Sequence, residues 1–174
     1  MPRQPDDPIT EFLRKQGASY AIVANGLRGL VENWERVVDQ VSKGYPQGLD
    51  DYLNDMDGRQ LLENALELAS VEARAQIMPR VRAADHRMLV LLKPAERCLW
   101  GPITAEDEGW TPERNWWYFQ VPKSAGPTLQ QELQDQMPAY FDRLKKEAGV
   151  EILEPKYRMQ AASPSGQVPK SAKP

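Results

Sequence analysis

Residues 20–45, YAIVANGLRGLVENWERVVDQVSKGY, are the stretch that decides the fold. Apolar side chains recur in it at alternating spacings of three and four, which keeps one apolar stripe along one side of an α-helix. Val31 and Val38 lie beside this stripe and widen it, which favours packing in a globular core over the narrow seam of a coiled coil. We therefore expect a central helix that other elements pack around. The stripe consists of Tyr20, Val23, Leu27, Leu30, Trp34, Val37, Val41 and Tyr45.

The rest of the sequence predicts a mainly α fold, a compact bundle of five or six helices. Thr10 is expected to cap the first helix, and Asp57, with Gln60 three residues on, to cap a helix that follows a shorter one at 49–56. Ser70 is expected to cap the next helix, which Pro79 should kink or split. Residues 128–149 predict the last helix of the bundle.

The pattern changes at about residues 95–122, where four of the five tryptophans gather. Residues 97–100 and 116–121 predict two short strands that pair as a small two-stranded aromatic ribbon, because aromatic and β-branched residues favour strands. Neighbouring side chains on a strand point to opposite faces, so Trp116 and Tyr118 would share one face, and Trp117 and Phe119 the other. A two-stranded ribbon is marginally stable alone in water, so we expect it to pack on the helices.

The chain of 174 residues has the length of one domain. We expect residues 1–9 to be a flexible N-terminal lead, 10–154 a single helical domain, and 155–174 a disordered basic tail rich in proline, serine and lysine. The tail carries four basic residues and no acid, so residues 1–154 hold 18 basic and 25 acidic residues. The formal net charge of −3 therefore combines an acidic body with a basic end.

This composition argues against several classes of function. An acidic body disfavours binding to the phosphates of nucleic acids. The sequence contains no apolar run long enough to span a bilayer and no recognisable signal sequence, so we expect a cytoplasmic protein without membrane contact. Cys98 and His86 are the only residues of their kinds, so a disulfide or a cysteine–histidine zinc site is not expected. No cofactor is implied by any motif.

One stretch resembles part of a calcium-binding loop. Asp55, Asp57 and Gly58 match its third, fifth and sixth positions, but Leu53 and Asn64 stand where carboxylate ligands are required. The interpretation of an acidic helix junction is therefore preferred. Because the sequence also lacks a catalytic motif, a non-catalytic protein is favoured over an enzyme.

Two surfaces are candidate binding sites, an aromatic block at residues 110–119 and an acidic stretch at residues 50–57. Tryptophan beside arginine and asparagine is common where protein partners or planar ligands dock. The alternative for the aromatic block is a lid over the core, and for the acidic stretch a solvated helix surface. The candidate residues are Trp110, Arg114, Asn115, Trp116, Trp117, Tyr118, Asp50, Asp51, Asp55 and Asp57.

These features predict a protein-interaction module, an acidic binder of a basic protein partner. An immunity or antitoxin-like role is one concrete form of this hypothesis. The alternative is a small enzyme or anionic-ligand binder with a pocket near Arg114 and the tryptophans, in which a carboxylate or His86 acts as base. A homodimer formed through the apolar stripe is a third interpretation. Stacking of single-stranded nucleic acid is disfavoured because basic residues near the tryptophans are too few.

Overall fold

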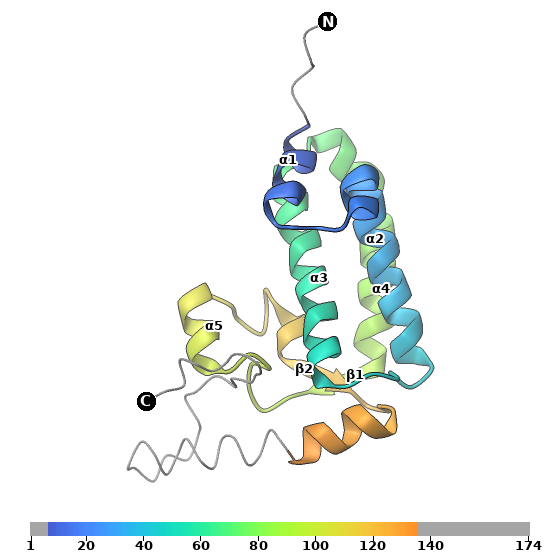
Figure 1. The fold of residues 1–174 in the computed structure, drawn as a ribbon, viewed down its shortest axis with the longest axis vertical. Helices are drawn as coiled ribbons and strands as arrows, with labels where there is room; N and C mark the ends of the chain where they lie inside the picture. Colours follow the sequence, from blue (N-terminus) through green and yellow to red (C-terminus); the bar gives the residue numbers. More distant parts are fainter. Residues whose placement is uncertain (1–6, 136–174) are drawn as a thin grey trace, which may run out of the picture.

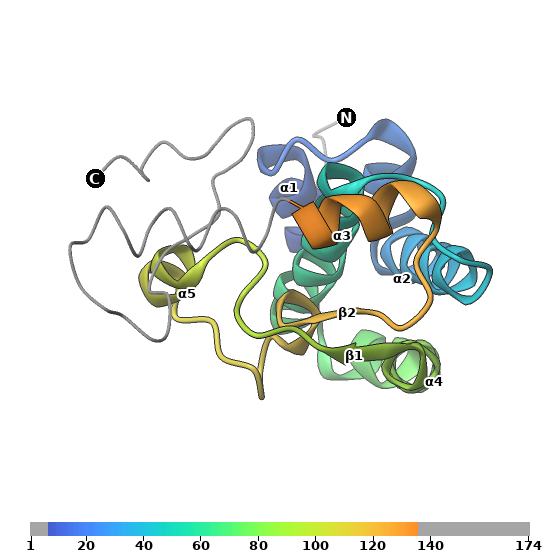
Figure 2. The same cartoon turned by 90° about the horizontal axis from the view of Figure 1, so that it is seen from below.

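The computed structural model describes residues 7–135. Three long helices, α2 (Tyr20–Ser42), α3 (Leu49–Leu68) and α4 (Val71–Leu91), stand side by side, with the short α1 (Pro8–Lys15) at one end (Figure 1). The other end carries β1 (Leu92–Pro94), α5 (Pro102–Glu108), the 3-10 turn η1 (Trp116–Tyr118) and β2 (Gln120–Pro122). Helical residues 127–135 cross this end when the bundle is seen from below (Figure 2). The predicted helical bundle with a small two-stranded ribbon is confirmed.

Helix α2 is the element that the other helices pack around, since it contacts α1, α3 and α4. From Leu30 to Val41 its predicted stripe is buried, and Val31 and Val38 beside it are buried as well. Tyr20, also predicted on the stripe, is instead 88 % exposed. Gly26, whose backbone (φ 58°, ψ −135°) is not helical, separates Tyr20 from the buried part of the stripe. This break takes the first turn out of register with the rest of the stripe.

The helix boundaries differ in part from the prediction. Asp7, not Thr10, caps α1, and Pro8 occupies the first turn, so this helix begins inside the predicted lead of residues 1–9. Ser70 caps α4 as predicted. Pro79 does not split α4, which continues to Leu91 with the proline inside it.

Helix α3 is one continuous helix, and the prediction of two helices separated at Asp57 was wrong. Asp57 lies in its middle and accepts hydrogen bonds from Trp100 and Tyr118, so its carboxylate serves a distant segment instead of a local cap. The start of α3 has no side-chain cap from its own cap residue. Glu132 Oε2 accepts a hydrogen bond from the Leu49 backbone N–H at 2.9 Å and supplies a carboxylate there.

The ribbon is shorter than predicted and lies elsewhere in the sequence. Its antiparallel register pairs Leu92 with Pro122 and Pro94 with Gln120, whereas residues 97–100 form bends and turns. Residues 116–118, predicted as strand, form a 3-10 turn, so the predicted alternation of faces was wrong. The neighbouring rings of Trp117 and Tyr118 are both buried. Packing of adjacent rings against α3 therefore prevails over their preference for strands.

Some predictions lie outside the described residues, namely the continuation of the last helix to residue 149 and the basic tail at 155–174. Within residues 7–135, no helix combines the length and apolar character needed to cross a membrane.

We expect Gly26→Ala to lower the free energy of unfolding by about 1–3 kcal/mol, because the backbone at this position is strained for any residue with a side chain. Gly58→Ala, inside α3, is the control. Its new Cβ would meet only the Asn33 amide end at 3.3 Å, and the expected change is within about 1 kcal/mol. Urea denaturation measures both, and equal losses would contradict the strain argument.

Candidate functional site

A buried ion pair joins the three long helices. Arg59 of α3 is 4 % exposed and holds Asp85 of α4 through two parallel hydrogen bonds, Nε to Oδ1 at 2.9 Å and Nη2 to Oδ2 at 2.8 Å. Trp34 of α2 donates its Nε1–H to Asp85 Oδ1 at 2.9 Å, the oxygen that also accepts from Arg59 Nε. Glu63, one turn along α3, accepts a hydrogen bond from Arg59 Nη1 at 3.1 Å. One guanidinium and one carboxylate thus tie α2, α3 and α4 together.

The aromatic block covers this ion pair. The Arg59 guanidinium carbon lies 4.3 Å from the Trp117 ring centroid, a cation–π contact. Burial alone would lower the pKa of Arg59, but its hydrogen bonds and charge contacts with Asp85 and Glu63 outweigh burial and raise that pKa. The Trp117 Nε1–H is buried and has no hydrogen-bond partner among the described residues. Arg59 and Asp85 were not predicted as site residues, because only the local Arg59–Glu63 spacing is visible in the sequence.

Asp57 forms a second anchor for the aromatic block. Its Oδ1 accepts a hydrogen bond from the Tyr118 hydroxyl at 2.6 Å and from Trp100 Nε1 at 3.1 Å. Burial raises the pKa of Asp57, although both hydrogen bonds oppose this effect. Trp110 stacks on Tyr118 with ring centroids 4.0 Å apart. These contacts hold the segment that contains the predicted binding residues against α3.

Asn115 is buried and has a positioning role. Its Nδ2 donates to Gln60 Oε1 at 2.9 Å, and its Oδ1 accepts the Thr111 backbone N–H at 3.2 Å. Arg114 beside it is exposed, and its backbone N–H donates to the Thr111 hydroxyl at 3.2 Å. The two neighbours predicted together therefore face different environments.

The predicted aromatic residues form one cluster with unequal access to solvent. Trp117 and Tyr118 are buried, whereas Trp110 and Trp116 are half-buried. The Trp116 ring contacts Trp117 at 5.5 Å between centroids and Trp34 at 6.3 Å. The block thus covers the core with part of its surface, and a binding role for its solvent-facing part stays a prediction.

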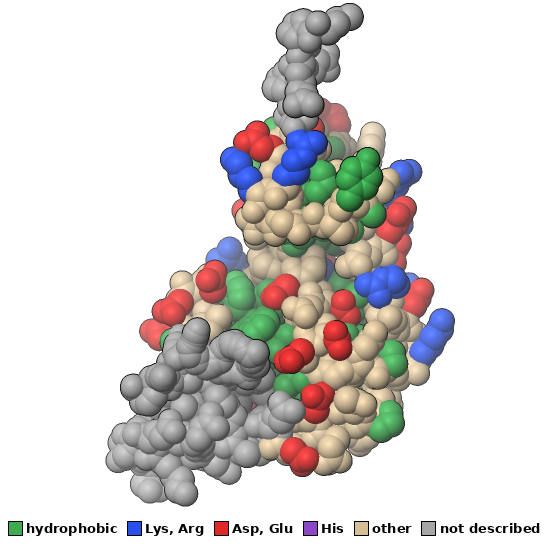
Figure 3. Space-filling view, in the orientation of Figure 1, with side chains coloured by type: hydrophobic (Ala, Val, Ile, Leu, Met, Phe, Trp, Pro, Cys, Tyr) green, Lys and Arg blue, Asp and Glu red, His purple; other side chains and the backbone are tan. Residues whose placement is uncertain are grey.

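The predicted acidic residues do not share one environment. Asp55 is half-buried and accepts a hydrogen bond from the Tyr45 hydroxyl at 2.5 Å, whereas Asp57 faces Trp100 and Tyr118. Asp50 and Asp51 are exposed at the start of α3. In the view of Figure 3, acidic side chains spread over the lower part of the molecule with hydrophobic side chains among them.

Asp50 and Asp51 lie close to a third carboxylate, Glu132. The pKa of Asp50 is raised by its partial burial and then by the negative charges of Glu132 and Asp51. We call these three residues the acidic cluster. Sequence reasoning found two of its members and missed Glu132, which lies far along the chain.

Three features within residues 7–135 concern metal, thiol and histidine chemistry. This part of the chain contains no group of three or more histidine, cysteine, aspartate or glutamate side chains arranged to hold a metal ion. Burial raises the pKa of the Cys98 thiol to about 12, so the nucleophilic thiolate is scarce at neutral pH. His86, the only histidine, is exposed on α4.

No protein-family model, no curated protein and no solved structure matches the chain. A functional argument for this protein therefore depends on its own residues and their geometry.

We expect Arg59→Met to lower the free energy of unfolding by about 3–5 kcal/mol, because Asp85 would keep its charge and lose its cation. Adding Asp85→Asn should restore much of this loss, since asparagine keeps an acceptor for Trp34 without a charge. Chemical denaturation of both single variants and the double variant gives the coupling free energy. Losses that simply add would show that the two side chains do not interact.

We expect Asp57→Ala to cost about 2–4 kcal/mol of unfolding free energy, because it leaves the Tyr118 hydroxyl and the Trp100 N–H without their acceptor. Asp57→Asn keeps an oxygen at this position and should cost clearly less.

The same residue predicts a pH dependence. The pKa of Asp57 in the folded state is raised above the ordinary value of 3.8, so the folded protein holds this proton more tightly than the unfolded chain. Its contribution to stability is fully present below pH 3.8 and is lost as the pH rises through the raised pKa. As the pH rises from 3.8 through the raised pKa, the free energy of unfolding of the unmodified protein should therefore fall relative to that of Asp57→Asn. A difference that stays constant across this range would contradict the prediction.

Proposed function

We propose that the protein is a non-catalytic interaction module that binds a basic protein partner through the acidic cluster. The observation that carries this proposal is the position of Glu132 at the start of α3, where its Oε2 accepts a hydrogen bond from the Leu49 backbone N–H at 2.9 Å beside the exposed Asp50 and Asp51. Burial raises the pKa of Asp50, and the negative charges of Glu132 and Asp51 raise it further. Mutual repulsion of carboxylates costs free energy, and the positive end of the α3 dipole offsets only part of it. Lysine and arginine side chains of a partner would remove the rest and gain attraction.

The solvent-facing aromatic side chains would contribute apolar contact to the same partner or to another part of it. Trp110 and Trp116 are half-buried, and Arg114 near them is exposed. Large aromatic side chains that buried neighbours already hold rigidly lose little conformational freedom on binding. Asn115, Trp117 and Tyr118 would hold them in place without touching the partner.

The proposal includes a cytoplasmic location, and neutralisation of a basic protein, as immunity proteins and antitoxins do, is one concrete form of it. A homodimer through the α2 stripe receives less support, because the stripe residues from Leu30 to Val41 are already buried in the bundle. An enzyme or ligand binder centred on Arg114 also receives less support, since the Arg114 side chain is exposed.

A charge-reversal experiment tests this function. The immobilised full chain is incubated with cell extract at about 50 mM salt, where surface electrostatic attraction is strong, and washed at rising salt. We expect a basic protein to be retained in stoichiometric amount at low salt and to be released at high salt. Asp50→Lys combined with Asp51→Lys should reduce its retention at least tenfold.

The matched control reverses two exposed acids at the other end of the bundle, Glu67→Lys with Glu72→Lys. This control changes the net charge equally and should keep the partner. The proposal is wrong if no stoichiometric partner is retained at low salt, or if both double variants lose it equally.

A further inference from the structure

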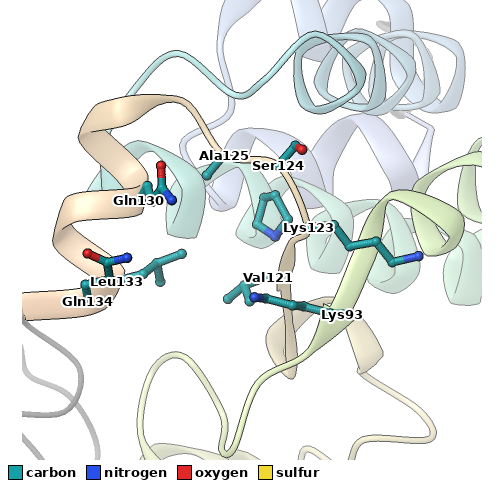
Figure 4. A pocket seen from close by; sticks show the side chains of 9 residues that line it. Lys93, Val121, Lys123, Ser124, Ala125, Gln130, Leu133 and Gln134 are labelled. Carbon is teal, nitrogen blue, oxygen red and sulfur yellow. The ribbon is translucent and has the colours of Figure 1, made fainter.

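A second surface of the protein is a hollow between the ribbon and helical residues 127–135. Its volume is about 390 Å³, within the range typical of small-molecule sites. Its walls come from β1, β2, the loop that follows β2, and one side of the terminal helical segment (Figure 4). None of the residues of the acidic cluster lines it.

The chemistry of this hollow is opposite to that of the acidic cluster. Its nine lining residues include two lysines, a serine and two glutamines, and no carboxylate. Val121 and Leu133 supply apolar surface between these polar groups. A basic lining is unexpected by composition, because residues 1–154 carry more acidic than basic residues. Most of the lining is therefore polar, and the apolar side chains add a smaller share of a concave surface that can hold a small ligand.

The two lysines of the hollow have different roles. The Lys123 ammonium group donates a hydrogen bond to the Val90 carbonyl oxygen at 3.0 Å near the end of α4, and its side chain extends away from residues 127–135 (Figure 4). Lys93 extends toward Val121 and Leu133. Among residues 7–135 the Lys93 ammonium group has no hydrogen bond or ion pair. Lys93 is therefore the cation that remains available to an anion in the hollow.

The backbone around the hollow is well fixed. Lys93 is paired with Val121 in the ribbon, and the Lys123 N–H donates to the Leu91 carbonyl at 2.9 Å. Beyond the ribbon, the Gly126 N–H donates to the Tyr45 carbonyl at 3.0 Å, and a Cβ at Gly126 would clash with that carbonyl. The loop that forms one wall is thus held against the bundle, so this wall does not require ordering on binding.

We infer that this hollow binds a small organic carboxylate with an apolar body. The Lys93 ammonium group would pair with the carboxylate, and the amides of Gln130 and Gln134 would donate hydrogen bonds to its oxygens. Val121 and Leu133 would cover the apolar part of the ligand. One available cation suits a single negative charge, and the apolar surface favours a carboxylate with a hydrocarbon portion over inorganic phosphate. This inference is independent of the proposed function, which uses a different surface.

Hexanoate is a suitable probe, with hexan-1-ol as the uncharged probe of equal chain length. We expect titration of the ¹⁵N-labelled full chain with hexanoate to shift the backbone amide NMR signals of Val121, of residues 123–125 and of residues 130–134 in a saturable way. Hexan-1-ol should bind at least ten times more weakly. Loss of one hydrogen bond to a charged group typically weakens binding by at least about tenfold, which is the effect expected for Lys93→Gln.

Lys123→Gln is the matched control, because it removes the same charge from the same hollow while leaving Lys93 in place. Its affinity for hexanoate should stay within about twofold of the unmodified protein. Three results would each overturn the inference: no saturable shift of these signals up to about 50 mM hexanoate, well above a millimolar dissociation constant; equal binding of hexan-1-ol; or unchanged affinity in Lys93→Gln. Signal dispersion in the same spectra verifies that each variant is folded.

Discussion

The contact on which the arrangement of the bundle depends is the buried pairing of Arg59 with Asp85. A charge that is almost completely removed from water must meet an opposite charge in good geometry, and few relative positions of α3 and α4 allow two parallel hydrogen bonds. Trp34 adds α2 to the same contact. This polar contact adds a requirement of direction and distance that apolar packing alone does not impose.

The middle of α3 also organises the aromatic block. Asp57, Arg59 and Gln60 are near neighbours on this helix. Asp57 accepts hydrogen bonds from Tyr118 of the block and from Trp100 before it, Arg59 contacts Trp117, and Gln60 accepts a hydrogen bond from Asn115. Polar groups of one helix thus hold a segment with little regular structure. The tryptophans consequently pack as part of the folded core, and only those that reach solvent are available to a partner.

The terminal described helix, residues 127–135, connects the two candidate surfaces. Its Glu132 joins the acidic cluster and accepts a hydrogen bond at the start of α3, while Gln130, Leu133 and Gln134 line the hollow beside the ribbon. Surfaces of opposite character therefore lie around one short helix. A basic protein and a small anion would meet different sides of it and would not compete for the same charges.

Side-chain spacing and residue type were sufficient to predict the helical class, the buried course of α2 from Leu30 to Val41, and the Ser70 cap. These features follow from interactions among residues that are neighbours along the chain. The unbroken α3, the ribbon register, the role of Asp57 and the Arg59–Asp85 contact depended on the tertiary structure. Their partners are 26 to 61 residues apart in the sequence, and only packing of the whole chain brings them within hydrogen-bond distance.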